Sequence, residues 1–117
     1  MEVPRPIGRL HHTVLDSPAP LELAQFYSAL TGMPITYRSD DWVVVSPRPD
    51  ASGLAFQLAP DHRPPQWPDP RHPQQVHFDV MVDDQHAAAE AVLALGATRL
   101  DAGDDFVFAD PAGHPFC

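Results

Sequence analysis

The sequence of 117 residues contains no lysine and a single cysteine, Cys117. Its seven basic residues, all arginines, are outnumbered by 16 acidic residues, and the formal net charge is −9 at pH 7. Binding to a phosphate backbone needs clustered positive charge, so the composition excludes a nucleic-acid partner. One cysteine also excludes an internal disulfide and a cysteine-rich zinc module.

Long hydrophobic runs are missing too. None approaches the roughly 18 residues that a transmembrane helix needs, and no basic amphipathic stretch is suited to a membrane surface. Residues 1–12 contain prolines and arginines but not the apolar stretch of a secretory signal. We therefore expect one cytoplasmic domain without a membrane partner. The hydrophobic content of 44% is enough for a packed core, and a small molecule is left as the default partner.

An internal repeat with a period of about 64 residues organises the chain. Residues 32–47 align with residues 96–111. Both segments begin with a glycine after an amphipathic stretch, continue through Asp-Asp-aromatic into a β-branched or aromatic run, and end at a proline. Outside these segments the repeat pairs His12 with His77 and Gln57 with Cys117. The sequence thus predicts two copies of one structural module.

The first copy reads as strand, helix and three strands. Residues Leu23, Phe26, Tyr27 and Leu30 recur at helical spacing between a start at 17–20, where Ser17 can cap, and a stop at Gly32. The predicted strands of this copy are 10–15, 35–37, 42–46 and 53–58.

The second copy begins with residues 76–82, in which apolar and other side chains alternate as in a strand. Asp83 or Asp84 is predicted to cap a helix that ends at Gly96. The later strands are 98–100, 105–109 and 115–117.

Residues 59–75 join the copies and contain six prolines, a composition that disfavours both a helix and a central strand. Two interpretations stand. The segment is a stiff extended crossover, or it forms a pocket rim where Trp67 touches a ligand or a partner subunit.

Three short motifs add to the repeat: residues 23–32, with Phe26-Tyr27 before Leu30-Thr31-Gly32; residues 75–80; and the turn Asp110-Pro111-Ala112-Gly113-His114. In this order, the motifs and the tandem βαβββ pattern resemble the vicinal-oxygen-chelate superfamily of glyoxalases, bleomycin-resistance proteins and dioxygenases. The resemblance implies an α+β fold in which two tandem βαβββ modules form a curved mixed sheet around a cavity, with the helices outside. It implies one glyoxalase-like domain over 1–117, made of module one (about 9–58), the Pro-rich crossover (59–75) and module two (about 76–117), and it implies a homodimer.

The resemblance also implies a metal site. Metal-dependent members place ligands on the first and last strand of each module, which correspond here to His12, Gln57, His77 and Cys117. Cys117 stands where the family usually has glutamate, and Gln57 stands at the other common carboxylate position. The expected cofactor is therefore either none or one divalent ion of nickel, iron, manganese or zinc.

Strand alternation places Asp79 on the same face as His77. Two histidines and one carboxylate can hold a metal at an open site, so Asp79 is a candidate ligand or catalytic base. The alternative is a hydrogen-bonded polar pair on a cavity wall. The aromatic residues Trp42, Phe106 and Phe108 are candidate ligand-binding residues or core.

Two functions follow from these candidates. The first is a metal-free protein that sequesters a small aromatic or cationic molecule beside a degenerate metal site. The second is a divalent-metal-dependent lyase, isomerase or dioxygenase acting on a substrate with vicinal oxygens. His11 is interpreted as structural or edge-exposed. The other histidines lie in predicted loops or at a helix start and are interpreted as solvent-exposed: His62, His72, His86 and His114.

Overall fold

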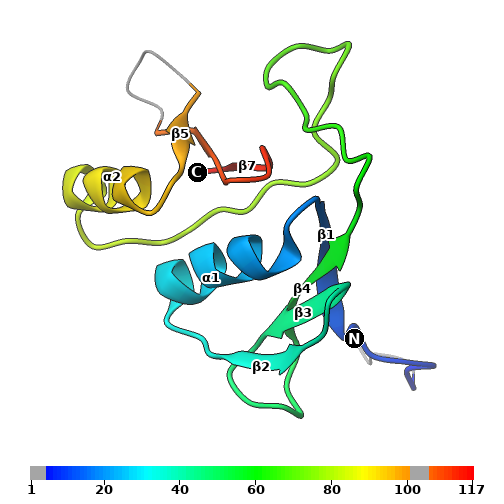
Figure 1. The fold of residues 1–117 in the computed structure, drawn as a ribbon. Coiled ribbons are helices and arrows are strands. Elements are labelled where there is room, and N and C mark those ends of the chain that lie inside the picture. The colour runs from blue at the N-terminus through cyan, green and yellow to red at the C-terminus, as the bar shows by residue number, and fades with distance from the viewer. Residues whose placement is uncertain (1–4, 101–105) are drawn as a thin grey trace.

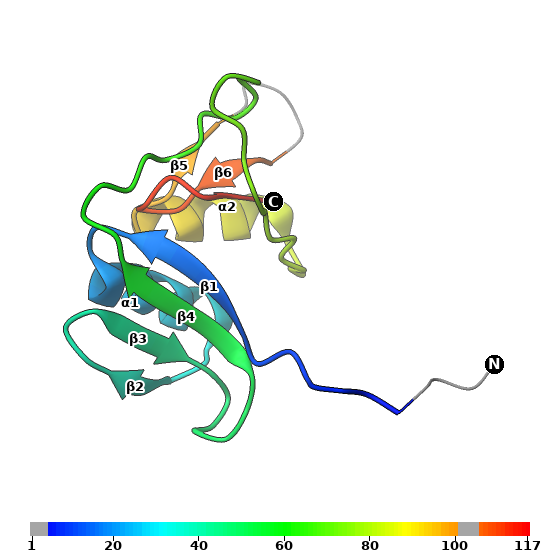
Figure 2. The same cartoon turned by 90° about the vertical axis from the view of Figure 1, so that its right-hand side faces the viewer.

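The computed structural model of the protein describes residues 5–100 and 106–117. The chain has two helices, a four-stranded mixed sheet and a three-stranded antiparallel sheet (Figure 1), which confirms the α+β class. In these residues no helix has the length and apolar character to cross a membrane. Residues 5–11 are largely exposed and lead away from the rest of the chain (Figure 2).

The first unit has the predicted βαβββ order. It consists of β1 (His12–Ser17), α1 (Pro20–Thr31), β2 (Ile35–Arg38), β3 (Trp42–Val45) and β4 (Gly53–Leu58). The strands lie in the order β1-β4-β3-β2, with β1 parallel to β4 and the other pairs antiparallel. Helix α1 thus connects an outer strand to the opposite side of the sheet, as a parallel pairing of β1 with β4 requires.

The ends of α1 follow the sequence signals, with one difference. Pro20 occupies the first turn, where its missing N–H costs nothing, but the N-cap residue is Ala19 rather than Ser17. Ser17 instead accepts a hydrogen bond from the Ala19 N–H through its Oγ at 2.9 Å. Gly32 ends the helix in the left-handed region at φ 78°, and its N–H donates to the Ser28 carbonyl.

The second unit has one helix followed by three short strands. It contains α2 (Gln85–Ala94), β5 (Thr98–Arg99), β6 (Phe108–Ala109) and β7 (Pro115–Phe116). Asp84 caps α2 by accepting hydrogen bonds from the N–H groups of the second and third following residues, as predicted. Of the predicted strand 105–109, Asp105 lies outside the described residues.

The predicted strand 76–82 is reduced to one parallel bridge between Phe78 and Phe116. Cys117 extends the bridge, since its N–H donates to the Phe78 carbonyl at 2.9 Å and its carbonyl accepts from the Val80 N–H at 2.7 Å. The partner strand β7 covers only two residues, so it can pair with no more of this segment. The parallel pairing of first and last segments nevertheless repeats that of β1 and β4.

The core is built around α1, which lies between the four-stranded sheet and the second unit (Figure 1). The Tyr27 ring stacks on Phe56 at 5.5 Å and meets the edge of Phe78 at 5.8 Å. Phe26 contacts Phe116 at 5.8 Å. Burying each such ring contributes about 1.5–3 kcal/mol. One helix therefore supplies the shared core of both units.

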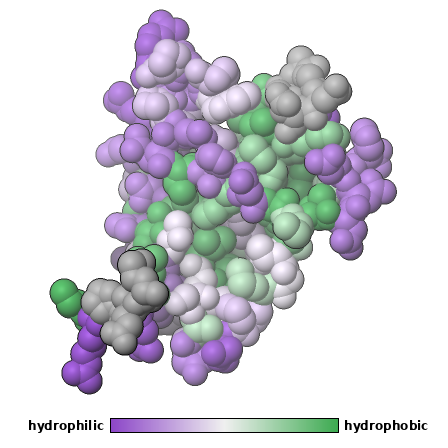
Figure 3. Space-filling model, turned by 180° about the vertical axis from the view of Figure 1, so that it is seen from behind, coloured by the Kyte–Doolittle hydropathy of each residue, from purple (hydrophilic) through white to green (hydrophobic). Residues whose placement is uncertain are grey.

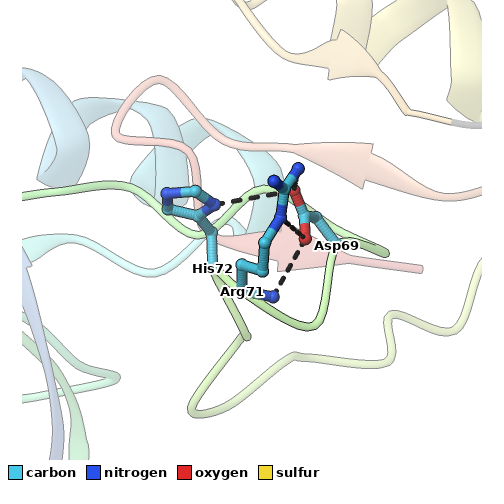
Figure 4. Close-up of polar contacts among 3 residues, drawn as sticks. All are labelled: Asp69, Arg71 and His72. Atoms are coloured by element: carbon cyan, nitrogen blue, oxygen red, sulfur yellow. Dashed lines mark hydrogen bonds and ion pairs between the residues drawn. The ribbon is translucent and has the colours of Figure 1, made fainter.

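The Pro-rich crossover has neither helix nor strand, as predicted. Its turn is organised by Asp69, which accepts hydrogen bonds from the Arg71 N–H and guanidinium and lies 3.6 Å from His72 (Figure 4). The hydrogen bonds from Arg71 lower the pKa of Asp69. This local network fixes the turn of an otherwise extended segment.

Candidate functional site

The metal donors that the resemblance implies in the first unit do not meet. His12 pairs with Gly53 across β1 and β4, whereas Gln57 pairs with Asp16. The two candidates are therefore four residues apart in register, or roughly 13 Å at about 3.3 Å per residue. The strand register therefore does not place the two side chains side by side.

His12 also has one ring nitrogen already engaged. Its Nδ1 accepts a hydrogen bond from the Gly53 N–H at 3.1 Å, so the neutral ring carries its proton on Nε2. Burial and the neighbouring His11 ring, 3.6 Å away between centroids, lower the pKa of His12. The single in-plane lone pair of the neutral ring is then engaged, and a metal could use it only by breaking this contact.

In the second unit, His77 and Cys117 do come together. Both line a small pocket of about 60 Å³ with Trp67, so the crossover forms part of this pocket's rim. His77 Nε2 lies 3.5 Å from the Asp79 carboxylate, and both side chains are exposed. Among residues 5–100 and 106–117, no group of three or more histidine, cysteine and acidic side chains could hold a metal ion.

The candidate aromatic residues separate into different places. Trp42 is the strand partner of Gln57, on the sheet face away from Phe56 and α1. Phe106 and Phe108 line an apolar cavity of about 230 Å³ between α1, α2 and the second sheet. Further apolar residues that line it are Leu30, Val80, Val92, Leu95 and Phe116.

Phe106 is held at this cavity in an unusual backbone conformation. Its φ of 51° lies in the left-handed region, which is uncommon for a bulky residue and costs on the order of 1–3 kcal/mol. The ring meets the edge of His86 at 5.4 Å, and the Arg99 guanidinium lies 5.0 Å from its centroid. These contacts orient the aromatic ring against the apolar cavity.

A second hollow, the junction cleft, lies where the two units meet the crossover. It has a volume of about 300 Å³ and is lined by Val14 and Asp16 of β1, by His62 and Arg63 of the crossover, and by Val76 and His114 of the second unit. His114 Nε2 lies 2.8 Å from the Asp16 carbonyl, and His62 Nε2 lies 2.9 Å from the Ala112 carbonyl. Because carbonyls only accept, both Nε2 atoms carry the proton.

Sequence reasoning missed these cleft residues. The strand face of Asp16 could have been predicted from the sequence, because Asp16 lies four residues after His12 and therefore on the same face of the strand. His62 and His114 gave no such signal, since their partners lie 50 and 98 residues away in the chain.

The buried link between the units is a hydrogen bond of 2.6 Å from the Tyr27 hydroxyl to the Asp110 carboxylate. Burial raises the pKa of Asp110, against the opposing effects of the Tyr27 hydrogen bond and of His114. Burial, followed by the nearby Asp110 charge, also raises the pKa of Tyr27. The Asp110 Oδ1 accepts from the N–H groups of Ala112 and His114 and so shapes the turn at 110–114.

Comparisons with known proteins identify the family of the chain and structures that share its fold. A family model described as a glyoxalase-like domain matches residues 12–117. A glyoxalase/bleomycin resistance protein/dioxygenase family enzyme from Burkholderia phytofirmans has a similar structure, with 17% identity, coverage of 90% of this chain and 92% of that chain, and a TM-score of 0.64. No curated protein matches the sequence.

Two further solved structures share the fold. The bleomycin resistance determinant encoded on the transposon Tn5 is 20% identical, covers 93% of this chain and 94% of its own, and has a TM-score of 0.54. The trypanothione-dependent glyoxalase I of Leishmania major is 14% identical, with coverage of 93% and 84% and a TM-score of 0.61.

The chain therefore belongs to the glyoxalase-like domain family. It shares its fold with solved structures described as a glyoxalase/bleomycin resistance protein/dioxygenase family enzyme and a bleomycin resistance determinant. Its structural neighbours include both an enzyme and a resistance determinant, so membership alone does not choose between catalysis and ligand binding.

Proposed function

We propose that the protein binds and sequesters a small aromatic molecule in the apolar cavity between α1, α2 and the second sheet. The observation that carries this proposal is the lining: two of the predicted ligand-binding residues, Phe106 and Phe108, face a hollow whose walls are otherwise almost entirely aliphatic and aromatic. Such a wall favours apolar ligands, and its few polar groups would fix their orientation.

The size of the cavity supports a ligand of one or two rings. An engineered cavity of roughly 150 Å³ lined by Leu, Ile and Phe binds benzene, and the cavity here measures about 230 Å³. Its few polar groups are the Gln85 amide and Cys117. A ring carrying one hydrogen-bonding substituent suits this combination.

The metal-dependent alternative is disfavoured by the placement of the donors. His12 and Gln57 are separated along the strands, and His77 and Cys117 line a pocket at the other end of the chain. A divalent ion in a family site would act as a Lewis acid on adjacent substrate oxygens. We derive no such step for this chain, because the strand register separates His12 from Gln57 and the described residues form no metal-binding group of three or more histidine, cysteine and acidic side chains.

The proposal includes a cytoplasmic homodimer. As the outer strands of the four-stranded sheet, β1 and β2 are the natural places for further pairing. Apolar residues also gather across the middle of one face (Figure 3), and Met81, Leu93 and Leu95 are among the exposed apolar side chains. Sedimentation equilibrium at micromolar concentration tests the assembly: a species of twice the chain mass supports it, and a monomer contradicts it.

The experiment that tests the binding function is a titration with indole, followed by ligand-observed NMR. The variant Ala88→Leu fills the cavity from α2, and the matched variant Ala87→Leu places the same side chain on an exposed position beside it. Binding that survives in Ala87→Leu and is lost in Ala88→Leu supports the proposal. Binding that is unaffected by both variants places the ligand elsewhere and contradicts it.

A further inference from the structure

The junction cleft has a different chemical character from the apolar cavity, because it carries two opposite charges. Asp16 and Arg63 both line it, and both residues are exposed. In the part of the chain that the structure describes, neither side chain has an ion pair or a side-chain hydrogen bond, although salt-bridged pairs such as Arg48 with Asp50 occur elsewhere.

The remaining polar groups of the cleft complement these charges. His62 and His114 use their Nε2–H groups on backbone carbonyls, so the Nδ1 atom of each neutral ring is left as an acceptor. The two rings lie side by side at 5.0 Å between centroids. Acceptors of this kind, together with the Asp16 carboxylate, suit a ligand ammonium group.

Groups that suit a ligand carboxylate come from the crossover, at Arg63 and Gln75. The Arg63 guanidinium can bind a carboxylate in two-point fashion, and the Gln75 amide, which lines the same cleft, can donate a further hydrogen bond. The apolar part of the cleft lining includes Val14, Pro65 and Val76. The volume of about 300 Å³ stands at the lower end of the range for ligand pockets.

We propose that the junction cleft is a second ligand site and that it takes a zwitterion with an apolar body, such as a free α-amino acid with an aromatic side chain. Asp16 and the two imidazoles receive the ammonium group, and Arg63 with Gln75 receives the carboxylate. Binding there bridges β1, the crossover and the second unit. This site is independent of the proposed function, because the junction cleft and the apolar cavity have no lining residue in common.

The test compares three probes by isothermal titration: L-phenylalanine, 3-phenylpropionate, which lacks the ammonium group, and phenethylamine, which lacks the carboxylate. A charge-assisted hydrogen bond contributes enough for each missing charge to weaken binding by about tenfold or more. Arg63→Gln is expected to weaken L-phenylalanine and 3-phenylpropionate and to leave phenethylamine unchanged. Asp16→Asn is expected to weaken L-phenylalanine and phenethylamine and to leave 3-phenylpropionate unchanged.

Two exposed charges outside the cleft provide matched control variants. Arg38→Gln and Asp40→Asn remove the same charges from exposed positions outside the cleft and are expected to change nothing. Equal affinity for the three probes, no binding of L-phenylalanine at millimolar concentration, or unchanged binding in Arg63→Gln and Asp16→Asn would each overturn the inference. Indole binding and its loss in Ala88→Leu report on the apolar cavity alone, so a failure here is distinguishable from a failure of the proposed function.

Discussion

The Tyr27 hydroxyl and the Asp110 carboxylate, 83 residues apart in sequence, form a buried hydrogen bond of 2.6 Å that joins α1 of the first unit to the turn at 110–114 of the second. The same turn reaches the first unit again through His114 and the Asp16 carbonyl. Tyr27 also packs between Phe56 and Phe78. Tyr27 therefore links the two halves of the repeat by a polar contact inside an aromatic core.

Replacing Tyr27 with phenylalanine tests this connection. The variant keeps the ring contacts but leaves a buried carboxylate oxygen without its donor, so the free energy of unfolding is expected to fall by about 1–3 kcal/mol at pH 7. Urea denaturation measures the change. As a control, Tyr37→Phe removes a hydroxyl from an exposed position and is expected to be neutral. An equal effect of both substitutions would contradict the assigned role of the hydrogen bond.

The pH dependence of stability tests the raised pKa of Asp110. A carboxyl whose pKa is higher in the folded state stabilises the fold fully below its unfolded pKa of about 4, and this contribution is lost as the pH rises through the folded value. Asp110→Asn cannot ionise and can still offer Oδ1 to the Ala112 and His114 N–H groups. Its stability relative to the wild type should therefore increase between pH 4 and pH 7 in urea titrations.

A second carboxylate supplies a control of opposite sign. The pKa of Asp69 is lowered by Arg71, so its contribution is present above about pH 4 and is lost as the pH falls. The pH-dependent part of the Asp69→Asn effect should therefore run opposite to that of Asp110→Asn. The same sign for both variants would rule out the burial argument for Asp110.

The glycine of the turn at 110–114 is expected to be essential for docking the crossover. Gly113 has φ 91°, and a Cβ there would overlap Pro64. Gly32 has a similar φ of 78°, but a Cβ there meets open space. Gly32→Ala is expected to cost about 1 kcal/mol for the backbone conformation, and Gly113→Ala measurably more. Thermal unfolding compares the two, and equal losses would mean that the Pro64 contact does not hold the crossover.

Metal content distinguishes the two functional alternatives. Protein purified without chelator is expected to retain less than one equivalent of nickel, iron, manganese or zinc, and the double variant His12→Ala, His77→Ala to retain the same amount. Elemental analysis provides the measurement. One full equivalent of metal per chain, lost in the double variant, would instead support the function of a metal-dependent lyase, isomerase or dioxygenase.

Local signals in the sequence were sufficient for much of the fold. Pro20 and Gly32 fix the ends of α1, Asp84 caps α2, and Trp42 with the β-branched run 43–45 forms β3. Each depends on a few neighbouring residues. The strand predicted at 76–82 is different, because its alternation is genuine but the available partner, β7, is too short to pair with it.

The candidate site was less predictable because strand register and long-range contacts decide it. Placing Leu15 opposite Phe56 under α1 also places Asp16, not His12, opposite Gln57. His77 and Cys117 line one pocket because each lies next to a residue of the parallel bridge between Phe78 and Phe116. The charges of the junction cleft depend on the path of the crossover, which no periodicity encodes.

The aromatic residues at the apolar cavity allow a sharp comparison. Phe106→Ala removes a ring from the wall and is expected to weaken indole binding by about threefold to tenfold, the usual value of one aromatic contact. Trp42→Ala removes a ring that was equally a candidate but lies outside the cavity, and it is expected to have no effect. A stronger effect of Trp42→Ala would move the binding site to the face of the first sheet.

The most direct test of ligand binding in the apolar cavity is the indole titration of the wild type beside Ala88→Leu and Ala87→Leu. The structure predicts saturable binding to the wild type and to Ala87→Leu, and none to Ala88→Leu, because only the last side chain enters the cavity between α1 and α2. Saturable binding of equal strength to all three proteins, or no binding to any of them, would contradict the proposal that the apolar cavity binds the ligand.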